Sequence, residues 1–146
     1  MRALTLIRPW AWAVCCAGKR IENRTWAPSE RQLAPGDRFA IHAGKGWDAD
    51  AAAWMRDNWV DTPTKALDPL GIVAVATFRG YGSPGLLAAA RTVDEAQLRH
   101  WAHGPICWLL ADVVVLPEAI PCRGAQGLWT VPAEIEARIA DARRGP

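Results

Sequence analysis

A lysine, a glutamate and an arginine lie close together in the sequence as Lys19, Glu22 and Arg24. Residues 21–26 alternate as a β-strand does, which would place Glu22, Arg24 and Trp26 on one face of that strand. A hydrophobic core does not need a face that carries a carboxylate, a guanidinium and an indole, so we interpret this face as part of a site. Lys19 and Glu22 could form a structural or binding ion pair, or they could act as a catalytic base and its partner.

Other residues have the chemistry needed to bind phosphate groups and nucleobases. An arginine guanidinium is a planar fork that can hold a phosphate through two hydrogen bonds, and a tryptophan can stack on an unpaired base. A glycine beside an arginine lets a nucleic-acid backbone approach closely. We therefore predict a nucleic-acid site that contains Arg8, Trp10, Arg24, Trp26, His42, Lys45, Arg123 and Gly124.

Several of these side chains also have a purely structural interpretation. Arg24 could form a salt bridge with a nearby carboxylate, and Lys45 between two glycines could mark an ordinary turn. Trp10 could close one end of a barrel, and His42 could be a hydrogen-bonded wall residue. The sequence alone leaves both interpretations open.

Three potential metal ligands, His100, His103 and Cys107, have a spacing that resembles a metal site. Gly104 and Pro105 would break the helix between them, and no second cysteine pair follows at a credible spacing. We therefore predict neither a bound metal nor another cofactor.

The order of the predicted elements favours an α+β fold. Short strands interrupted by helices do not show the regular alternation of a parallel α/β sheet, so a small mixed barrel with helices packed on the outside is the better expectation. We predict strands at 4–7, 21–26, 37–43, 70–81, 106–116, 119–122 and 127–131, helices at 9–18, 47–59, 93–103 and from Pro132 onward, a turn at 44–46, and a loop with a possible short helix at 82–91.

The composition is typical of a single globular domain over residues 1–146. Hydrophobic residues make up 51% of the chain, which includes nine tryptophans, and this is ample for a core. No apolar run reaches the ~18 residues of a membrane helix, and the N-terminus lacks a signal-peptide pattern. We expect a cytoplasmic protein without a membrane partner, and four cysteines, two of them adjacent, that form no disulfide framework.

The net charge of +2 is unevenly distributed along the chain. Residues 1–46 carry a net charge of +5, whereas the remaining residues carry −3. A basic half beside an acidic half favours a face suited to a polyanion, although scattered solvent-exposed charge is the alternative.

Four segments of the sequence lie at 8–11, 18–24, 41–43 and 123–129. Taken together and in this order, they resemble an ASCH domain, a branch of the PUA-like superfamily. The resemblance runs from Leu4 to about Pro132 and implies a mixed β pseudo-barrel. One branch of the family removes the acetyl group from N4-acetylcytidine with a lysine, a threonine three residues later and a distant glutamate. Lys19 matches that lysine, but Glu22 stands where the threonine would be.

We predict from these observations a nucleic-acid-binding protein, with RNA favoured over DNA as the partner. Arginine and lysine side chains would hold phosphates while a tryptophan stacks on an unpaired or modified base. The alternative is a metal-independent hydrolase that uses the same cleft, either a ribonuclease or an amidohydrolase of a modified nucleoside. A third possibility is an interaction module without a nucleic-acid ligand. The sequence does not define an oligomeric state.

Overall fold

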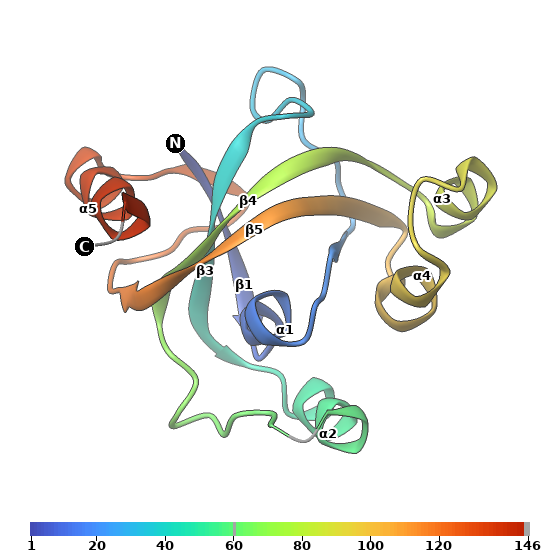
Figure 1. Cartoon of the computed structure of the whole chain (residues 1–146), viewed down its shortest axis with the longest axis horizontal. Helices are drawn as coiled ribbons and strands as arrows, with labels where there is room; N and C mark the ends of the chain where they lie inside the picture. Colours follow the sequence, from blue (N-terminus) through green and yellow to red (C-terminus); the bar gives the residue numbers. More distant parts are fainter. Residues whose placement is uncertain (60, 145–146) are drawn as a thin grey trace.

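One mixed β-sheet forms the centre of the molecule (Figure 1). The computed structural model describes residues 1–59 and 61–144. Six strands follow the order β2-β5-β4-β3-β1-β6, with β1 and β3 parallel and all other neighbours antiparallel. The strands are β1 (Arg2–Arg8), β2 (Ile21–Arg24), β3 (Arg38–Trp47), β4 (Gly71–Gly82), β5 (Ile106–Ile120) and β6 (Leu128–Thr130).

The sheet is strongly curved but stays open. β2 and β6 form its two edges and do not pair with each other within the described residues. β6 pairs with β1 only as far as Leu4. The next carbonyl of β1, that of Thr5, accepts a hydrogen bond from Arg24 Nη2 of β2 at 3.0 Å. The Arg24 side chain thus links the edge strand β2 to β1, the neighbour of the other edge strand, β6. This arrangement confirms the predicted α+β fold, whereas the open sheet fits a pseudo-barrel only loosely.

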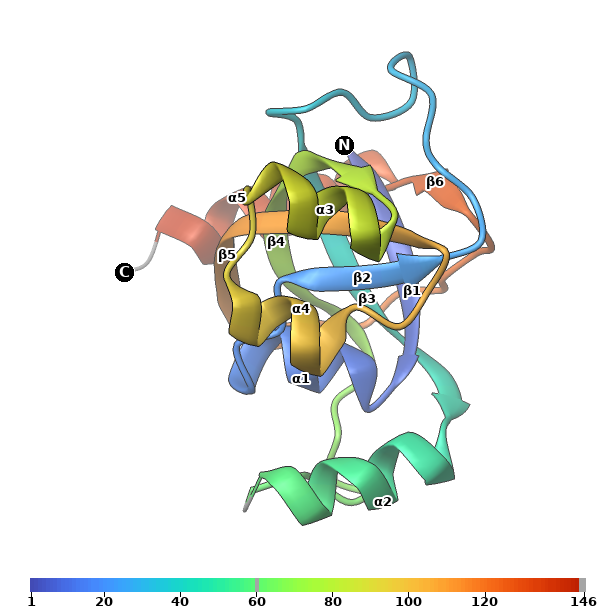
Figure 2. The same ribbon diagram turned by 90° about the vertical axis from the view of Figure 1, so that its right-hand side faces the viewer.

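The part of the chain that the structure describes has five helices, which pack around this sheet. α1 contacts β1, β3, β4 and β5, and its Ala11 and Val14 join the apolar cluster inside the curve. α5 covers a second apolar cluster, because Ile135 and Ile139 lie four residues apart on one helical face. α4 contacts β2, and α3 contacts α4. Figure 2 shows α2 at the bottom of the view, below α1. The helices are α1 (Trp10–Cys16), α2 (Ala49–Asn58), α3 (Pro84–Ala90), α4 (Glu95–Trp101) and α5 (Ala133–Arg144).

Tertiary pairing changes two of the predicted strand boundaries. The segment predicted as a turn at 44–46 belongs to β3, because β1 pairs with β3 as far as Trp47. Gly44 is required there, since a Cβ atom at this position would lie 2.8 Å from Thr5 Cγ2. The separate strand predicted at 119–122 is wrong as well, because β5 continues without interruption to Ile120.

Smaller differences concern the ends of elements. Trp26 lies beyond β2, which ends at Arg24. The predicted helix over 47–59 begins at Ala49, because Asp48 caps it by accepting a 2.8 Å hydrogen bond from the Ala51 amide. The possible short helix in 82–91 is α3. No helix among the described residues is long and apolar enough to span a membrane.

Candidate functional site

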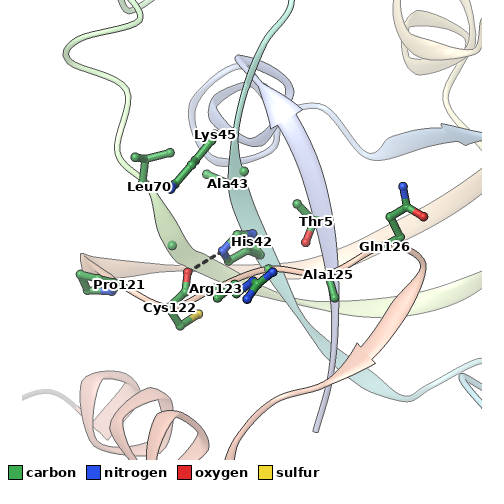
Figure 3. A pocket seen from close by; sticks show the side chains of 13 residues that line it. Thr5, His42, Ala43, Lys45, Leu70, Pro121, Cys122, Arg123, Ala125 and Gln126 are labelled. Carbon is green, nitrogen blue, oxygen red and sulfur yellow. Dashed lines mark hydrogen bonds between the residues drawn. The ribbon is translucent and has the colours of Figure 1, made fainter.

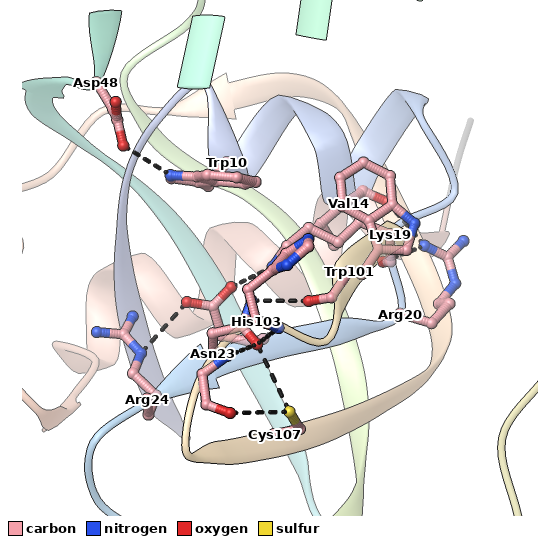
Figure 4. A network of polar contacts seen from close by, with 12 residues as sticks. Trp10, Val14, Lys19, Arg20, Asn23, Arg24, Asp48, Trp101, His103 and Cys107 are labelled. Atoms are coloured by element: carbon pink, nitrogen blue, oxygen red, sulfur yellow. Dashed lines mark hydrogen bonds and ion pairs between the residues drawn. The ribbon is translucent and has the colours of Figure 1, made fainter. Parts of the chain in front are cut away.

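The lysine, glutamate and arginine near the N-terminus form a buried ion network, which we define as Lys19, Glu22 and Arg24 (Figure 4). Lys19 is 1% exposed, and its amino group forms an ion pair with Glu22 Oε2. Arg24 Nε lies 3.3 Å from Glu22 Oε1. The alternation of β2 therefore places Glu22 and Arg24 on one face, as predicted. The single Glu22 carboxylate lies between two cations, so the network carries a net positive charge, and its Arg24 side chain is partly exposed.

Two predicted tryptophans lie near this network but contact protein groups. The Lys19 amino group lies 5.6 Å from the centroid of the Trp10 ring, and Trp10 Nε1 donates a 3.3 Å hydrogen bond to Asp48. Trp26 packs edge-to-face on Trp108 with ring centroids 4.9 Å apart. Trp26 also lines a small pocket of about 270 Å³ with Arg24. Trp26 thus borders a cavity of the described residues, whereas the Trp10 indole is bonded to a carboxylate.

Arg8, a predicted phosphate ligand, is buried and bonded to the backbone. Its Nε donates to the Gly44 carbonyl at 2.9 Å, and Nη1 donates to the carbonyls of Lys65 at 3.0 Å and Asp68 at 2.7 Å. Nη2 donates to the Lys45 carbonyl at 3.2 Å. This side chain joins the end of β3 to the loop before β4, so we leave it out of the candidate site.

The other four predicted residues meet in a pocket of about 980 Å³ (Figure 3). His42 and Lys45 come from β3, whereas Arg123 and Gly124 come from the connection between β5 and β6. Lys45 and Arg123 are exposed and form no ion pair within the described residues. Among residues 1–59 and 61–144, no aspartate or glutamate side chain lines the pocket. Its full lining is Thr5, His42, Ala43, Gly44, Lys45, Leu70, Gly71, Pro121, Cys122, Arg123, Gly124, Ala125 and Gln126.

Sequence reasoning missed Thr5, Cys122 and Gln126 as lining residues. A threonine in the otherwise apolar segment 4–7 was the one available signal for Thr5. Its hydroxyl accepts a 3.0 Å hydrogen bond from Trp129 Nε1. Cys122 and Gln126 carried no local signal, because their place in the pocket depends on how the β5–β6 connection passes over β1 and β3.

His42 is the buried polar group of the pocket. Its Nε2 lies 3.1 Å from the Cys122 carbonyl oxygen, and since a carbonyl can only accept, Nε2 carries the proton. Burial lowers the pKa of His42 below its ordinary value, which favours the neutral ring. Nδ1 has no hydrogen-bond partner among the described residues.

Gly124 is required for this arrangement. A Cβ atom there would lie 2.5 Å from His42 Cε1 and 2.6 Å from Thr5 Oγ1, so the backbone passes directly over both side chains. The sequence predicted that Gly124 lets a nucleic-acid backbone approach closely. In the structure, the groups that lie close to Gly124 are the protein's own His42 and Thr5 side chains.

The potential metal ligands on and after α4 serve other contacts. His103 Nε2 lies 2.7 Å from the His100 carbonyl oxygen, and Cys107 Sγ donates to Asn23 Oδ1 at 3.6 Å. The two histidine rings pack on Trp54 and Trp59. No group of three or more histidine, cysteine or acidic side chains within residues 1–59 and 61–144 is arranged to hold a metal ion.

Comparison with solved structures identifies the fold. The ASCH protein from Zymomonas mobilis is 15% identical, with 96% of this chain and 93% of that chain covered and a TM-score of 0.52. A point mutant of the same protein is 16% identical, with 96% of each chain covered and a TM-score of 0.52. This chain has the ASCH fold. No protein-family model and no curated protein sequence matches it. The structural match confirms the fold that the sequence resemblance implied.

Proposed function

We propose that this ASCH-fold protein binds nucleic acid through the pocket between β1, β3 and the β5–β6 connection. The observation that carries the proposal is the pocket lining, which contains two exposed cations from distant segments and, among the residues that the structure describes, no carboxylate. Lys45 and Arg123 would contact phosphates at the mouth, since their charges are not matched by acidic partners among the described residues.

RNA is the favoured partner because of the shape of the site. A pocket of about 980 Å³ is concave enough to take an unpaired nucleotide, and proteins that recognise RNA sequences mostly bind unstacked bases in single strands, loops and bulges. The apolar part of the lining, Ala43, Leu70 and Pro121, offers surface for a base rather than for a duplex backbone.

The test is a binding panel of single- and double-stranded RNA and DNA at two salt concentrations. Because each neutralised phosphate releases counterions, affinity should fall steeply between about 50 and 200 mM salt. Lys45→Glu and Arg123→Glu should each weaken binding by about tenfold or more and reduce the salt dependence. Arg56→Glu on α2 is the matched control, since Arg56 is exposed but does not line the pocket. Binding that is absent, or insensitive to salt and to both pocket variants, would overturn the proposal.

The buried ion network favours a second candidate, a metal-independent hydrolase of RNA or of a modified nucleoside such as N4-acetylcytidine. Buried charges next to an indole are expensive to maintain and occur often at active sites. The measurement is single-turnover conversion of labelled RNA and of N4-acetylcytidine by the wild type and Lys19→Arg. Conversion that disappears in a folded Lys19→Arg variant would support the hydrolase, and no conversion by the wild type would reject it for these substrates.

A further inference from the structure

His42 has an unused hydrogen-bond acceptor beneath the Gly124 backbone that lines the pocket. The residue is 4% exposed and lines the cavity. Its Nε2–H is bonded to the Cys122 carbonyl, as Figure 3 shows, so the lone pair of the neutral ring is on Nδ1. Buried polar atoms are nearly always paired, and each exception calls for an explanation. A ligand that donates a hydrogen bond to Nδ1 is such an explanation.

Thr5 places a donor beside this acceptor. Thr5 and His42 are opposite each other in the parallel β1–β3 pair. Thr5 Oγ1 and His42 Nδ1 each lie 2.6 Å from the point that a Gly124 Cβ would occupy, so the two polar atoms are close neighbours. Because Thr5 Oγ1 accepts a hydrogen bond from Trp129 Nε1, its own proton is free to be donated.

We propose that the pocket holds one unpaired nucleobase with its polar edge toward His42 and Thr5, and the adjacent phosphates at Lys45 and Arg123. The inference rests on the proposed function and adds the orientation of the nucleotide. A nucleobase edge presents neighbouring donor and acceptor groups, which complement an acceptor and a donor side by side. A phosphate would be disfavoured at the inner end, because its oxygens are acceptors and would face the Nδ1 lone pair.

The base reaches Nδ1 when one segment of chain moves. We call residues 123–126 the strap. The Gly124 backbone in the strap lies over His42 and Thr5, and Nδ1 is closed to solvent. The four strap residues donate and accept no hydrogen bond within residues 1–59 and 61–144. Displacing the strap therefore breaks no hydrogen bond, and the bond between Cys122 and His42 that fixes the tautomer stays in place.

The experiment compares single-stranded hexaribonucleotides with a hexamer in which every base is replaced by an abasic sugar. The wild type should bind the best intact hexamer at least about tenfold more tightly than the abasic one, since the base contributes a hydrogen bond to a buried group and stacking surface. His42→Phe keeps an aromatic ring but has no acceptor, so the difference between the two hexamers should shrink while the salt dependence stays. His42→Asn places its Oδ1 near the position of Nδ1 and should restore part of the difference.

The outcomes separate this inference from the proposed function. If no nucleic acid binds, both are wrong. If intact and abasic hexamers bind the wild type equally and with strong salt dependence, nucleic-acid binding stands and the orientation is overturned. This wild-type comparison needs no variant to fold. If His42→Phe is as stable as the wild type but loses affinity for both hexamers equally, this result would also contradict a base-reading role.

A pH titration with oligouridylate gives an independent readout on the wild type. Protonation converts Nδ1 from acceptor to donor, and burial puts the pKa of His42 below its ordinary value. The preference for intact over abasic RNA should therefore hold at neutral pH and decline only at acidic pH. The other charged groups that line the pocket are the cations Lys45 and Arg123, and burial raises the pKa of the Cys122 thiol, away from the acidic range of this experiment.

Discussion

The buried ion network and the pocket adjoin each other at Thr5 but differ in how their polar groups are satisfied. On one side of Thr5, its carbonyl accepts from Arg24, whose neighbour Glu22 also pairs with Lys19, so each charge of the network has a partner. On the other side, its hydroxyl lines a cavity where His42 Nδ1 has no partner. The residues with the strongest sequence signal thus pair with one another, whereas the pocket, built from distant segments, contains a buried histidine nitrogen that has no hydrogen-bond partner among the described residues.

The largest expected effect is on the buried ion network. Lys19→Met leaves the Glu22 carboxylate buried with only Arg24 beside it, so the free energy of unfolding should fall by about 3–5 kcal/mol. The double variant Lys19→Met/Glu22→Gln also removes the buried carboxylate charge and should recover a substantial part of this loss. Urea denaturation of the wild type and the variants measures both values. If Lys19→Met were as stable as the wild type, the network would not have a structural role.

The second effect tests how closely the strap passes over the pocket. Gly124→Ala puts a Cβ atom 2.5 Å from His42 Cε1, so the strap or the histidine must shift, at a cost of about 1–3 kcal/mol in unfolding free energy. Gly85→Ala is the control, because a Cβ atom at Gly85 has no neighbour within 4 Å. Thermal and urea denaturation should show a lower stability for Gly124→Ala but not for Gly85→Ala. Equal stabilities of the two would show that the strap already stands away from His42.

Part of this arrangement could be predicted from the sequence. The alternation in 21–26 correctly placed Glu22 and Arg24 on one face, because strand periodicity is a local property. The extension of β3 through Lys45 could not be predicted, since it depends on pairing with β1 and the local Gly-Lys-Gly pattern is typical of turns.

The partners of the predicted arginines depended even more on tertiary structure. Arg8 was predicted to bind phosphate, but its four carbonyl partners include Lys65 and Asp68, in a loop almost 60 residues away in the sequence. The meeting of His42 with Arg123 requires both the β4-β3-β1 strand order and the path of the β5–β6 connection. No pattern within either segment contains that information.

Asp68 differs from both the buried ion network and the pocket. It is a buried carboxylate without an ion pair among the described residues. Burial raises the pKa of Asp68 from 3.8 to about 6, with the Arg8 charge opposing the rise. The folded state therefore binds a proton more tightly than the unfolded state does. The stabilisation is complete below pH 3.8 and is lost as the pH rises through about 6.

Asp68→Asn mimics the protonated side chain at every pH. At pH 8 the free energy of unfolding of this variant should exceed that of the wild type by about 1–2 kcal/mol. The difference should vanish near pH 4. Urea denaturation across this range is the measurement. Asp37→Asn, at an exposed carboxylate in the loop before β3, is the control and should not reproduce this pattern. A wild type that gains stability from pH 4 to pH 8 relative to Asp68→Asn would contradict the assignment.

The smallest expected effect is the change in unfolding free energy when a pocket cation is replaced. This effect distinguishes the pocket from the buried ion network. Lys45 and Arg123 are exposed and have no ion pair within the described residues. Lys45→Gln and Arg123→Gln should therefore change the free energy of unfolding by no more than about 0.5 kcal/mol, as is usual for surface substitutions. Arg56→Gln on α2 should behave in the same way. The three variants should differ only in oligonucleotide binding, which the two pocket variants weaken and the α2 variant does not. A loss of stability comparable to that of Lys19→Met would mean that the pocket cations, like the buried ion network, hold the fold together, and the contrast between the two regions would disappear.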